Sequence, residues 1–440
     1  MKKQSAQLNR SIAPVPAVHM AMHLDEPGRL ALDNGTEVCL IEAGQEEVTR
    51  IDLIFNAGSA FQKKHLVAAA ANRLLREGTR SHSSFQIAST LDYHGAYLDT
   101  SVTKDTAILT LYCLNKYLPQ LLPLLSEMLY EPAYPADELQ TYLHKQKQEF
   151  LTNSSKVKYR AMLGFNSLVF GADSAYGQQL NELDFGLVDI SDINSFYQQY
   201  YLPENGWILV SGNISKELPS QLNRYFGQYP GTHPDFKLPM VHYADSVIHS
   251  GDHLEEKVDA LQSAIRIGRP IVGKSHPDFN TLQLLNMVLG GYFGSRLMTN
   301  LREEKGFTYG VSSHLVNYRY GGFFSVATEV NAIHTEAALA EICDEIKLLR
   351  EVPVGEEELS LVKNYLYGTF LRSFDGPFAL SDRYISARDH DLEFSYYQKS
   401  LATMMQTTSE QLMEAANRYL VPEQMIRLVV GKKEKNTTVK

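Results

Sequence analysis

The chain has 440 residues, 44% of them hydrophobic and 21% charged, which is typical of a globular protein long enough to bury two or more cores. Its formal net charge is −10 with the acidic residues dispersed, which argues against nucleic acid as a partner. Cys39, Cys113 and Cys343 are far apart in largely apolar runs, so neither a disulfide framework nor a cysteine zinc site is indicated. No apolar run approaches membrane-spanning length, and the N-terminus lacks the apolar core of a secretory signal. We therefore expect no membrane partner and a cytoplasmic location, or a periplasmic one if an upstream signal has been removed.

The first half of the chain begins with a polar arm at 1–26 and a hairpin at 29–41, whose turn is signalled by Asn34-Gly35. Alternating apolar residues predict a strand at 50–57, and Ser83 is a favourable N-cap for a helix. The other elements expected here are strands at 96–102, 106–113 and 207–212 and helices at 65–76, 83–93, 116–128, 136–153, 157–170, 191–200 and 216–226.

The second half repeats this order of elements. The expected strands are 261–267, 309–316, 322–328 and 426–431, and the expected helices are 279–289, 295–305, 335–350, 356–370, 379–390 and 409–419. Glycines at corresponding element ends pair as Gly78 with Gly290, Gly95 with Gly306 and Gly212 with Gly431, at offsets of 212, 211 and 219 residues. A nearly constant offset indicates a duplicated domain.

These patterns predict the domain organisation. A polar arm at 1–26 precedes a first domain at 27–230, a linker at 231–252 rich in Pro, His and Asp, and a second domain at 253–440. Strands segregate from long helical runs in each half. We therefore predict an α+β fold of two homologous domains, each a mainly antiparallel sheet with helices packed on one face.

The stretch 289–309, LGGYFGSRLMTNLREEKGFTY, is the most informative part of the chain. Leucines four residues apart form the apolar edge of a short helix, and Gly306 ends it before a strand that starts near Tyr309. Arg302 then lies on the last helical turns. A guanidinium and a phenol on opposite sides of one tight turn can converge on a single carbonyl oxygen.

A glycine-rich loop precedes that helix and comprises Gly290, Gly291, Gly294, Ser295 and Arg296. It lacks the Lys-Ser/Thr of a phosphate loop and the glycine spacing of a dinucleotide site. We therefore interpret it as a mobile loop between two helices that can touch a peptide.

The loop, its Ser-Arg-Leu triplet at 295–297, and an arginine and tyrosine seven residues apart together resemble the second domain of the pitrilysin/insulinase (inverzincin) metalloproteases. The resemblance extends from about residue 29 to residue 431. It implies that Arg302 and Tyr309 bind the substrate carbonyl and stabilise the oxyanion that forms there. Arg296 is an alternative carbonyl binder, although its place beside Ser295 favours a role in anchoring the loop.

The same resemblance directs attention to the first domain, where the family has a His-x-x-Glu-His zinc motif. Its flanking signals are present here as Ala-Gly-Ser at 57–59 and Gly-Thr at 78–79. Counting back from them, Ala69 and Arg73 stand at the histidine positions and Asn72 at the position of the general base. Alanine has no donor atom, asparagine is not a base at neutral pH, and arginine repels a dication. We expect no metal or other cofactor to be bound by this chain.

The position of the family's third ligand falls on Glu149, so one carboxylate persists. Either Glu149 is an ordinary surface glutamate, or Arg73 occupies the vacant zinc position and pairs with it. Both interpretations remain open at this stage.

The resemblance implies a non-catalytic subunit of a heterodimeric zinc metallopeptidase. A homologous partner would supply the zinc, and this chain would supply Arg302, Tyr309 and half of a chamber that encloses a peptide substrate. The alternative is a catalytically inert peptide-binding or scaffold protein of the same fold, which forms a homodimer in the partner's absence. A self-sufficient hydrolase is not supported, because the sequence has no Gly-x-Ser-x-Gly elbow and no clustered Cys/His pair.

Overall fold

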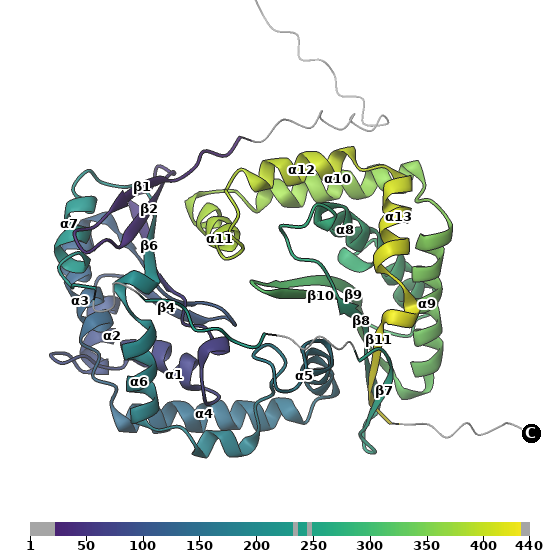
Figure 1. The fold of residues 1–440 in the computed structure, drawn as a ribbon, viewed down its shortest axis with the longest axis horizontal. Coiled ribbons are helices and arrows are strands. Elements are labelled where there is room, and N and C mark those ends of the chain that lie inside the picture. Colours follow the sequence, from purple (N-terminus) through teal and green to yellow (C-terminus); the bar gives the residue numbers. More distant parts are fainter. Residues whose placement is uncertain (1–22, 232–235, 244–248, 433–440) are drawn as a thin grey trace, which may run out of the picture.

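The computed structural model describes residues 23–231, 236–243 and 249–432. Two β-sheets, one in each half of the described chain, lie apart from one another with helices around them (Figure 1). The predicted arm at 1–26 lies almost wholly outside the described residues, as does part of the predicted linker.

The first sheet has six strands in the order β1-β2-β6-β3-β5-β4. Neighbouring strands are antiparallel except β2 and β6, which are parallel. The strands are β1 (Gly28–Ala31), β2 (Glu37–Glu42), β3 (Val48–Phe55), β4 (Tyr97–Val102), β5 (Ala107–Leu114) and β6 (Gly206–Gly212). The helices of this half are α1 (Val67–Arg73), α2 (Ser84–Tyr93), α3 (Leu118–Tyr130), α4 (Ala136–Ser154), α5 (Val157–Phe170), α6 (Ile190–Tyr200) and α7 (Leu218–Phe226).

The second sheet has five strands in the order β7-β11-β8-β10-β9, with β7 and β11 parallel and the other pairs antiparallel. The strands are β7 (Gly251–Glu256), β8 (Gln262–Pro270), β9 (Val311–Tyr318), β10 (Gly321–Asn331) and β11 (Ile426–Gly431). The helices are α8 (Phe279–Asn286), α9 (Thr335–Glu351), α10 (Glu356–Arg372), α11 (Pro377–Arg388), α12 (Tyr396–Gln406) and α13 (Ser409–Tyr419), with π-helical turns at Met287–Gly291 and Met298–Glu304.

The two sheets repeat one topology. In each, the last strand along the chain lies between a parallel neighbour and an antiparallel one, and a hairpin completes the far edge. The first sheet differs by its additional edge strand, β1. The predicted α+β fold of two homologous, mainly antiparallel domains is confirmed.

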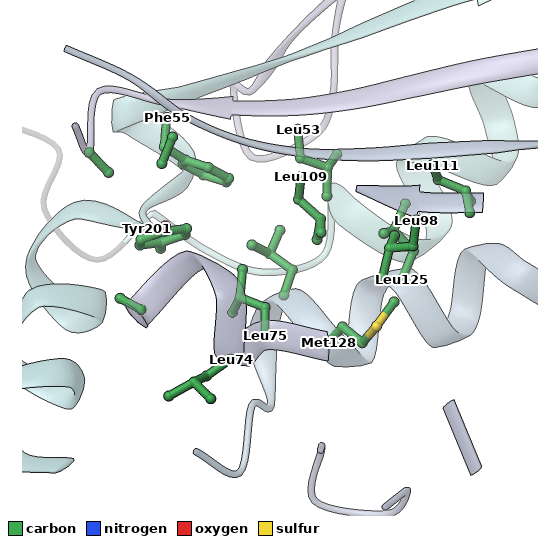
Figure 2. Packing of buried hydrophobic residues seen from close by; sticks show 14 of the residues in the cluster. Leu53, Phe55, Leu74, Leu75, Leu98, Leu109, Leu111, Leu125, Met128 and Tyr201 are labelled. Carbon is green, nitrogen blue, oxygen red and sulfur yellow. The ribbon is translucent and has the colours of Figure 1, made fainter. Parts of the chain in front are cut away.

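Helix α1 packs against the first sheet because one of its faces is almost entirely small and apolar. Ala68, Ala70 and Ala71 are 0% exposed, which allows the helix to approach strands β4 and β5 closely. Figure 2 shows the leucines that follow, Leu74 and Leu75, close to residues of this core. Burying a leucine side chain fully contributes roughly 1.5–3 kcal/mol, so this layer fixes the position of α1.

Each domain also gives one helix to the other domain's sheet. Helix α5 of the first half packs on β8 and β11 through Phe165 and Val169, and α11 of the second half packs on β2 and β6 through Tyr384 and Ile385. In Figure 1, both helices lie between the two halves. This exchange was not predicted, because an amphipathic pattern identifies a buried face but not the sheet that covers it.

Two regular elements were missed from the sequence. Strand β7 begins at Gly251 inside the predicted linker, and its GDHLEE sequence has a single large apolar residue. It is an edge strand whose side chains alternate between partly and fully exposed. Its sequence therefore lacks the alternating apolar residues by which a strand is recognised. Helix α12 was also missed, although its buried Tyr397, Leu401 and Met404 follow helical spacing.

Candidate functional site

Helix α1 carries the positions at which the resemblance places a zinc motif. Ala69 and Arg73 lie one turn apart on the same face and are partly exposed. Asn72 is 1% exposed, and its Nδ2 donates a hydrogen bond to the Tyr201 hydroxyl over 3.1 Å. Burial raises the pKa of Tyr201, so the phenol stays protonated at neutral pH. The position of a general base is thus filled by a neutral amide bonded to a neutral phenol.

Of the two interpretations left open for Glu149, the one in which Arg73 pairs with it is wrong. Nη2 of Arg73 lies 3.0 Å from Oε1 of Glu77, which is four residues further along the chain, and no ion pair within 4 Å joins it to Glu149 among the described residues. Arg73 and Glu77 are four residues apart, about one helical turn, which brings their side chains together, whereas Glu149 lies on α4 and is exposed. The carboxylate and the guanidinium nevertheless act on a common neighbour. Burial raises the pKa of Tyr142 to about 12. The charge of Arg73 opposes this rise, and the charge of Glu149 adds to it.

These residues do not fit a zinc ion. The three positions on α1 offer a methyl group, an amide and a guanidinium, and only the amide oxygen of Asn72, buried without a donor, is a possible ligand. Zinc sites in proteins use three or four nitrogen, sulfur or carboxylate ligands. Within the described ranges, no group of three or more His, Cys, Asp or Glu is arranged to hold a metal ion.

The glycine-rich loop of the second domain follows α8 through a π-helical turn and packs against β9. Gly290 is buried, and a Cβ atom there would lie 2.8 Å from the backbone nitrogen of Ser313, so glycine is required for this close approach. Ser295 is 1% exposed and Gly291 partly buried, whereas Gly294 is exposed. The loop is therefore anchored at both ends, and its tip faces solvent.

Arg296 holds the loop to α10. Its Nε donates to Oε1 of Glu358 over 2.8 Å and its Nη2 donates to Oε2 over 2.7 Å. A bidentate pair of this kind fixes the plane of the guanidinium as well as its charge. Arg296 is thus engaged within the chain, in agreement with the anchoring role that its place beside Ser295 favours.

Arg302 and Tyr309 lie in a different situation. The guanidinium carbon of Arg302 lies 4.4 Å from the centre of the Phe293 ring, and no carboxylate lies within 4 Å of the guanidinium among the described residues. Tyr309 is 95% exposed on the turn before β9. That turn is fastened to β10, because Oγ1 of Thr308 donates to the carbonyl of Glu329 over 2.7 Å. The segments that carry Arg302 and Tyr309 are fixed by these contacts. In the described structure, neither side chain is paired with a carboxylate.

Comparison with known proteins assigns the family. Residues 37–163 match the insulinase (peptidase family M16) model, and residues 188–366 match the peptidase M16 inactive domain. A solved structure from Pseudomonas fluorescens, described as a peptidase M16 inactive domain, has a TM-score of 0.83 at 22% identity and covers 93% of this chain and 98% of its own. The chain belongs to the M16 (insulinase) peptidase family.

Curated relatives of this M16 chain carry two kinds of name. An uncharacterized zinc protease of Bacillus subtilis, YmxG, is 21% identical over 352 residues, which are 79% of this chain and 84% of that protein. A probable inactive metalloprotease of the same species, YmfF, is 22% identical over 402 residues, which are 85% of this chain and 91% of that protein. The residues on α1 place this M16 chain with the inactive members of the family. In the described part of the chain, no helix is both long and apolar enough to cross a bilayer.

Sequence reasoning missed the two residues that give Arg296 and Arg302 their different surroundings. Phe293 is nine positions before Arg302, a separation at which neither helix nor strand geometry predicts contact. Glu358 is 62 residues after Arg296, on a helix whose first turn holds three consecutive glutamates. No local signal distinguishes which of the three reaches the loop.

Proposed function

We propose that this M16 chain is the non-catalytic subunit of a heterodimeric zinc metallopeptidase, working in the cytoplasm. A homologous subunit with an intact zinc motif would hold the metal. This chain would contribute Arg302 and Tyr309 as hydrogen-bond donors to the carbonyl oxygen of the scissile peptide bond, together with half of the chamber that encloses the peptide.

The contrast between the two domains carries this proposal. At the zinc-motif positions of α1, the donor groups of Asn72 and Arg73 are bonded to Tyr201 and Glu77 of the same chain. In the second domain, Arg302 has no carboxylate within 4 Å in the described structure, and Tyr309 is 95% exposed. Donors that have no carboxylate partner in the described part of their own chain are available to a substrate held elsewhere.

A donor aimed at charge that develops in the transition state is worth more in turnover than in binding. Losing one such hydrogen bond costs about 2.7–4 kcal/mol in known cases. We therefore expect Arg302→Ala or Tyr309→Phe to reduce kcat of the assembled enzyme by roughly 10²–10³-fold while peptide affinity stays nearly constant.

The measurement is peptide cleavage by this chain co-expressed with an M16 homologue from the same organism that has an intact zinc motif. Tyr93→Phe is a matched control, because Tyr93 is also a highly exposed tyrosine, 85% exposed, but lies on α2. Without the partner, the purified chain is expected neither to bind stoichiometric zinc nor to cleave peptides. Unchanged turnover in both variants, or cleavage by this chain alone, would contradict the proposal. Peptide binding by a homodimer without any gain in turnover on adding the homologue would favour the scaffold alternative.

A further inference from the structure

A cavity of about 440 Å³ lies in the second domain, between the edge strand β9 and helices α8, α10, α11 and α12. In Figure 1, α8, α10 and α12 lie in the upper part of the second half, and α11 lies beside them towards the first half. Its volume falls within the ≈ 300–1,000 Å³ typical of small-molecule sites. It adjoins the glycine-rich loop through Met287 and Gly291, but neither Arg302 nor Tyr309 lines it. It is therefore a separate feature from the donors discussed above.

The charged residues that line this cavity are basic. Lys274 and Arg383 line it, and among the described residues no aspartate or glutamate does. His314 also lines it, with a pKa that burial and the charge of Arg266 lower, so that its ring is neutral at pH 7. Nζ of Lys274 donates to Oγ of Ser386 over 2.7 Å, and Nε of Arg383 donates to the carbonyl of Ser373 over 3.4 Å. In the described structure no carboxylate lies within 4 Å of either cation. Burial and the charge of Arg383 lower the pKa of Lys274 to about 8, as expected of a cation without an anion beside it.

Two buried amide oxygens on α8 also lack partners. Oε1 of Gln283 and Oδ1 of Asn286 accept no hydrogen bond within the described residues, and both side chains line the cavity. The orientation of the Asn286 amide is set by its Nδ2, which donates to the carbonyl of Ser313 over 3.2 Å. The cavity thus offers acceptors for an N–H group as well as cations for an anion.

Aromatic side chains complete the wall. Phe370, Phe374 and Tyr397 line the cavity and pack on one another, with ring centres 5.1 Å apart for Phe370 and Phe374 and also 5.1 Å apart for Phe374 and Tyr397. Such rings bury apolar or aromatic groups of a ligand and limit its orientation.

We propose that this cavity binds a carboxylate that carries a neighbouring N–H group and an apolar side chain. Lys274 and Arg383 would hold the carboxylate, the amide oxygens of Gln283 and Asn286 would accept the N–H, and the aromatic wall would hold the side chain. An N-acylated amino acid and the C-terminal residue of a peptide share this chemistry. The site is built entirely from this chain, so it depends on neither the zinc-bearing subunit nor the role of Arg302.

Isothermal titration calorimetry on the purified full chain tests the proposal with two pairs of probes. The first pair is N-acetyl-phenylalanine and its amide, and the second is a pentapeptide ending in phenylalanine with a free or an amidated C-terminus. We expect at least one free acid to bind about tenfold or more tightly than its amide, since a lost charged contact is worth 1.4 kcal/mol or more. Which pair shows the preference identifies the source of the carboxylate.

Variants connect the binding to this cavity. Lys274→Met should weaken the preference for the acid over the amide, because only Arg383 then remains to hold the carboxylate. Gln283→Leu should weaken the acid and the amide alike, because both retain the N–H. Lys399→Met is the matched control, because Lys399 has a side chain that is 75% exposed and does not line the cavity. Equal binding of acid and amide, no binding of any probe at millimolar concentration, or an acid preference that Lys274→Met leaves unchanged would overturn the proposal.

Discussion

Replacing Lys274 by methionine should stabilise the protein at neutral pH. The buried ammonium has a pKa of about 8, compared with 10.5 for an ordinary lysine, because burial and Arg383 oppose its charge while only Asp389 favours it. At 1.36 kcal/mol per pKa unit, this difference corresponds to a penalty of about 3 kcal/mol in the folded state at pH 7. Methionine has a similar length, and the lost hydrogen bond to Ser386 costs about 1 kcal/mol. We therefore expect the free energy of unfolding of Lys274→Met to be about 2 kcal/mol higher than that of the wild type.

The sign of the pH dependence makes this prediction specific. Below pH 8 the ammonium is protonated in both the folded and the unfolded state, so the penalty is fully present. Between pH 8 and pH 10.5 the unfolded state binds more protons, and the stability of the wild type rises relative to the variant. The penalty falls below about 0.5 kcal/mol at pH 10.5, so the remaining difference reflects only the hydrogen bond and packing.

Urea unfolding at pH 7 and pH 10.5 measures both quantities, with Lys399→Met as the exposed control, expected to change stability by less than about 0.5 kcal/mol. A variant that is less stable than the wild type at pH 7 would refute the reasoning. So would a stabilisation that does not shrink at high pH. Either result would mean that the ammonium has a partner that offsets its burial.

Two further predictions concern other parts of the chain. Burial, Lys274 and Arg319 lower the pKa of His390 to about 4 from 6.5, so the unfolded state binds its proton first as the pH falls. As the pH falls from 6.5 to 4, protonation of this histidine in the unfolded state should lower the free energy of unfolding of the wild type by up to about 3 kcal/mol. His390→Gln should lack this loss, which thermal melting of both proteins at pH 6.5 and pH 4 measures. Restoring the zinc motif by the triple change Ala69→His, Asn72→Glu and Arg73→His should create a zinc site, with one zinc bound per chain by calorimetry. No binding by the triple variant would mean that the motif's register on α1 is misplaced.

The sequence predicted elements best where strong end signals flank the apolar pattern. Helix α5 was predicted with its observed bounds, because Gly171, at φ +89°, stops a helix that ordinary side chains would continue. Helix α2 begins where expected because Ser83 caps it and Gln86 returns the bond in a capping box. These signals act over three or four residues, so a single sequence contains them in full.

What could not be predicted depends on contacts between distant segments. Over the seven residues Met298–Glu304, a π-helix and an α-helix give nearly the same pattern of apolar residues in the sequence. Only the structure shows that this segment has π-helical hydrogen bonding. The choice between the two interpretations of Glu149 has a similar origin. A family-like interval suggested that Arg73 could reach Glu149, whereas the structure pairs Arg73 with Glu77, four residues away. The anchoring of Arg296 was favoured by its place beside Ser295, but its partner Glu358 was not identifiable.

The polar groups of this chain divide into two kinds, and the division bears on function. At the zinc-motif positions of α1, the Asn72 amide nitrogen is bonded to Tyr201 and the Arg73 guanidinium is paired with Glu77, which lowers the free energy of the folded chain. Lys274 is buried without a carboxylate beside it, which raises that free energy. A hydrophobic residue of equal size would be more stable there. A largely buried cation that raises the free energy of the free chain is suited to an anionic ligand, which is the class of ligand proposed above for Lys274.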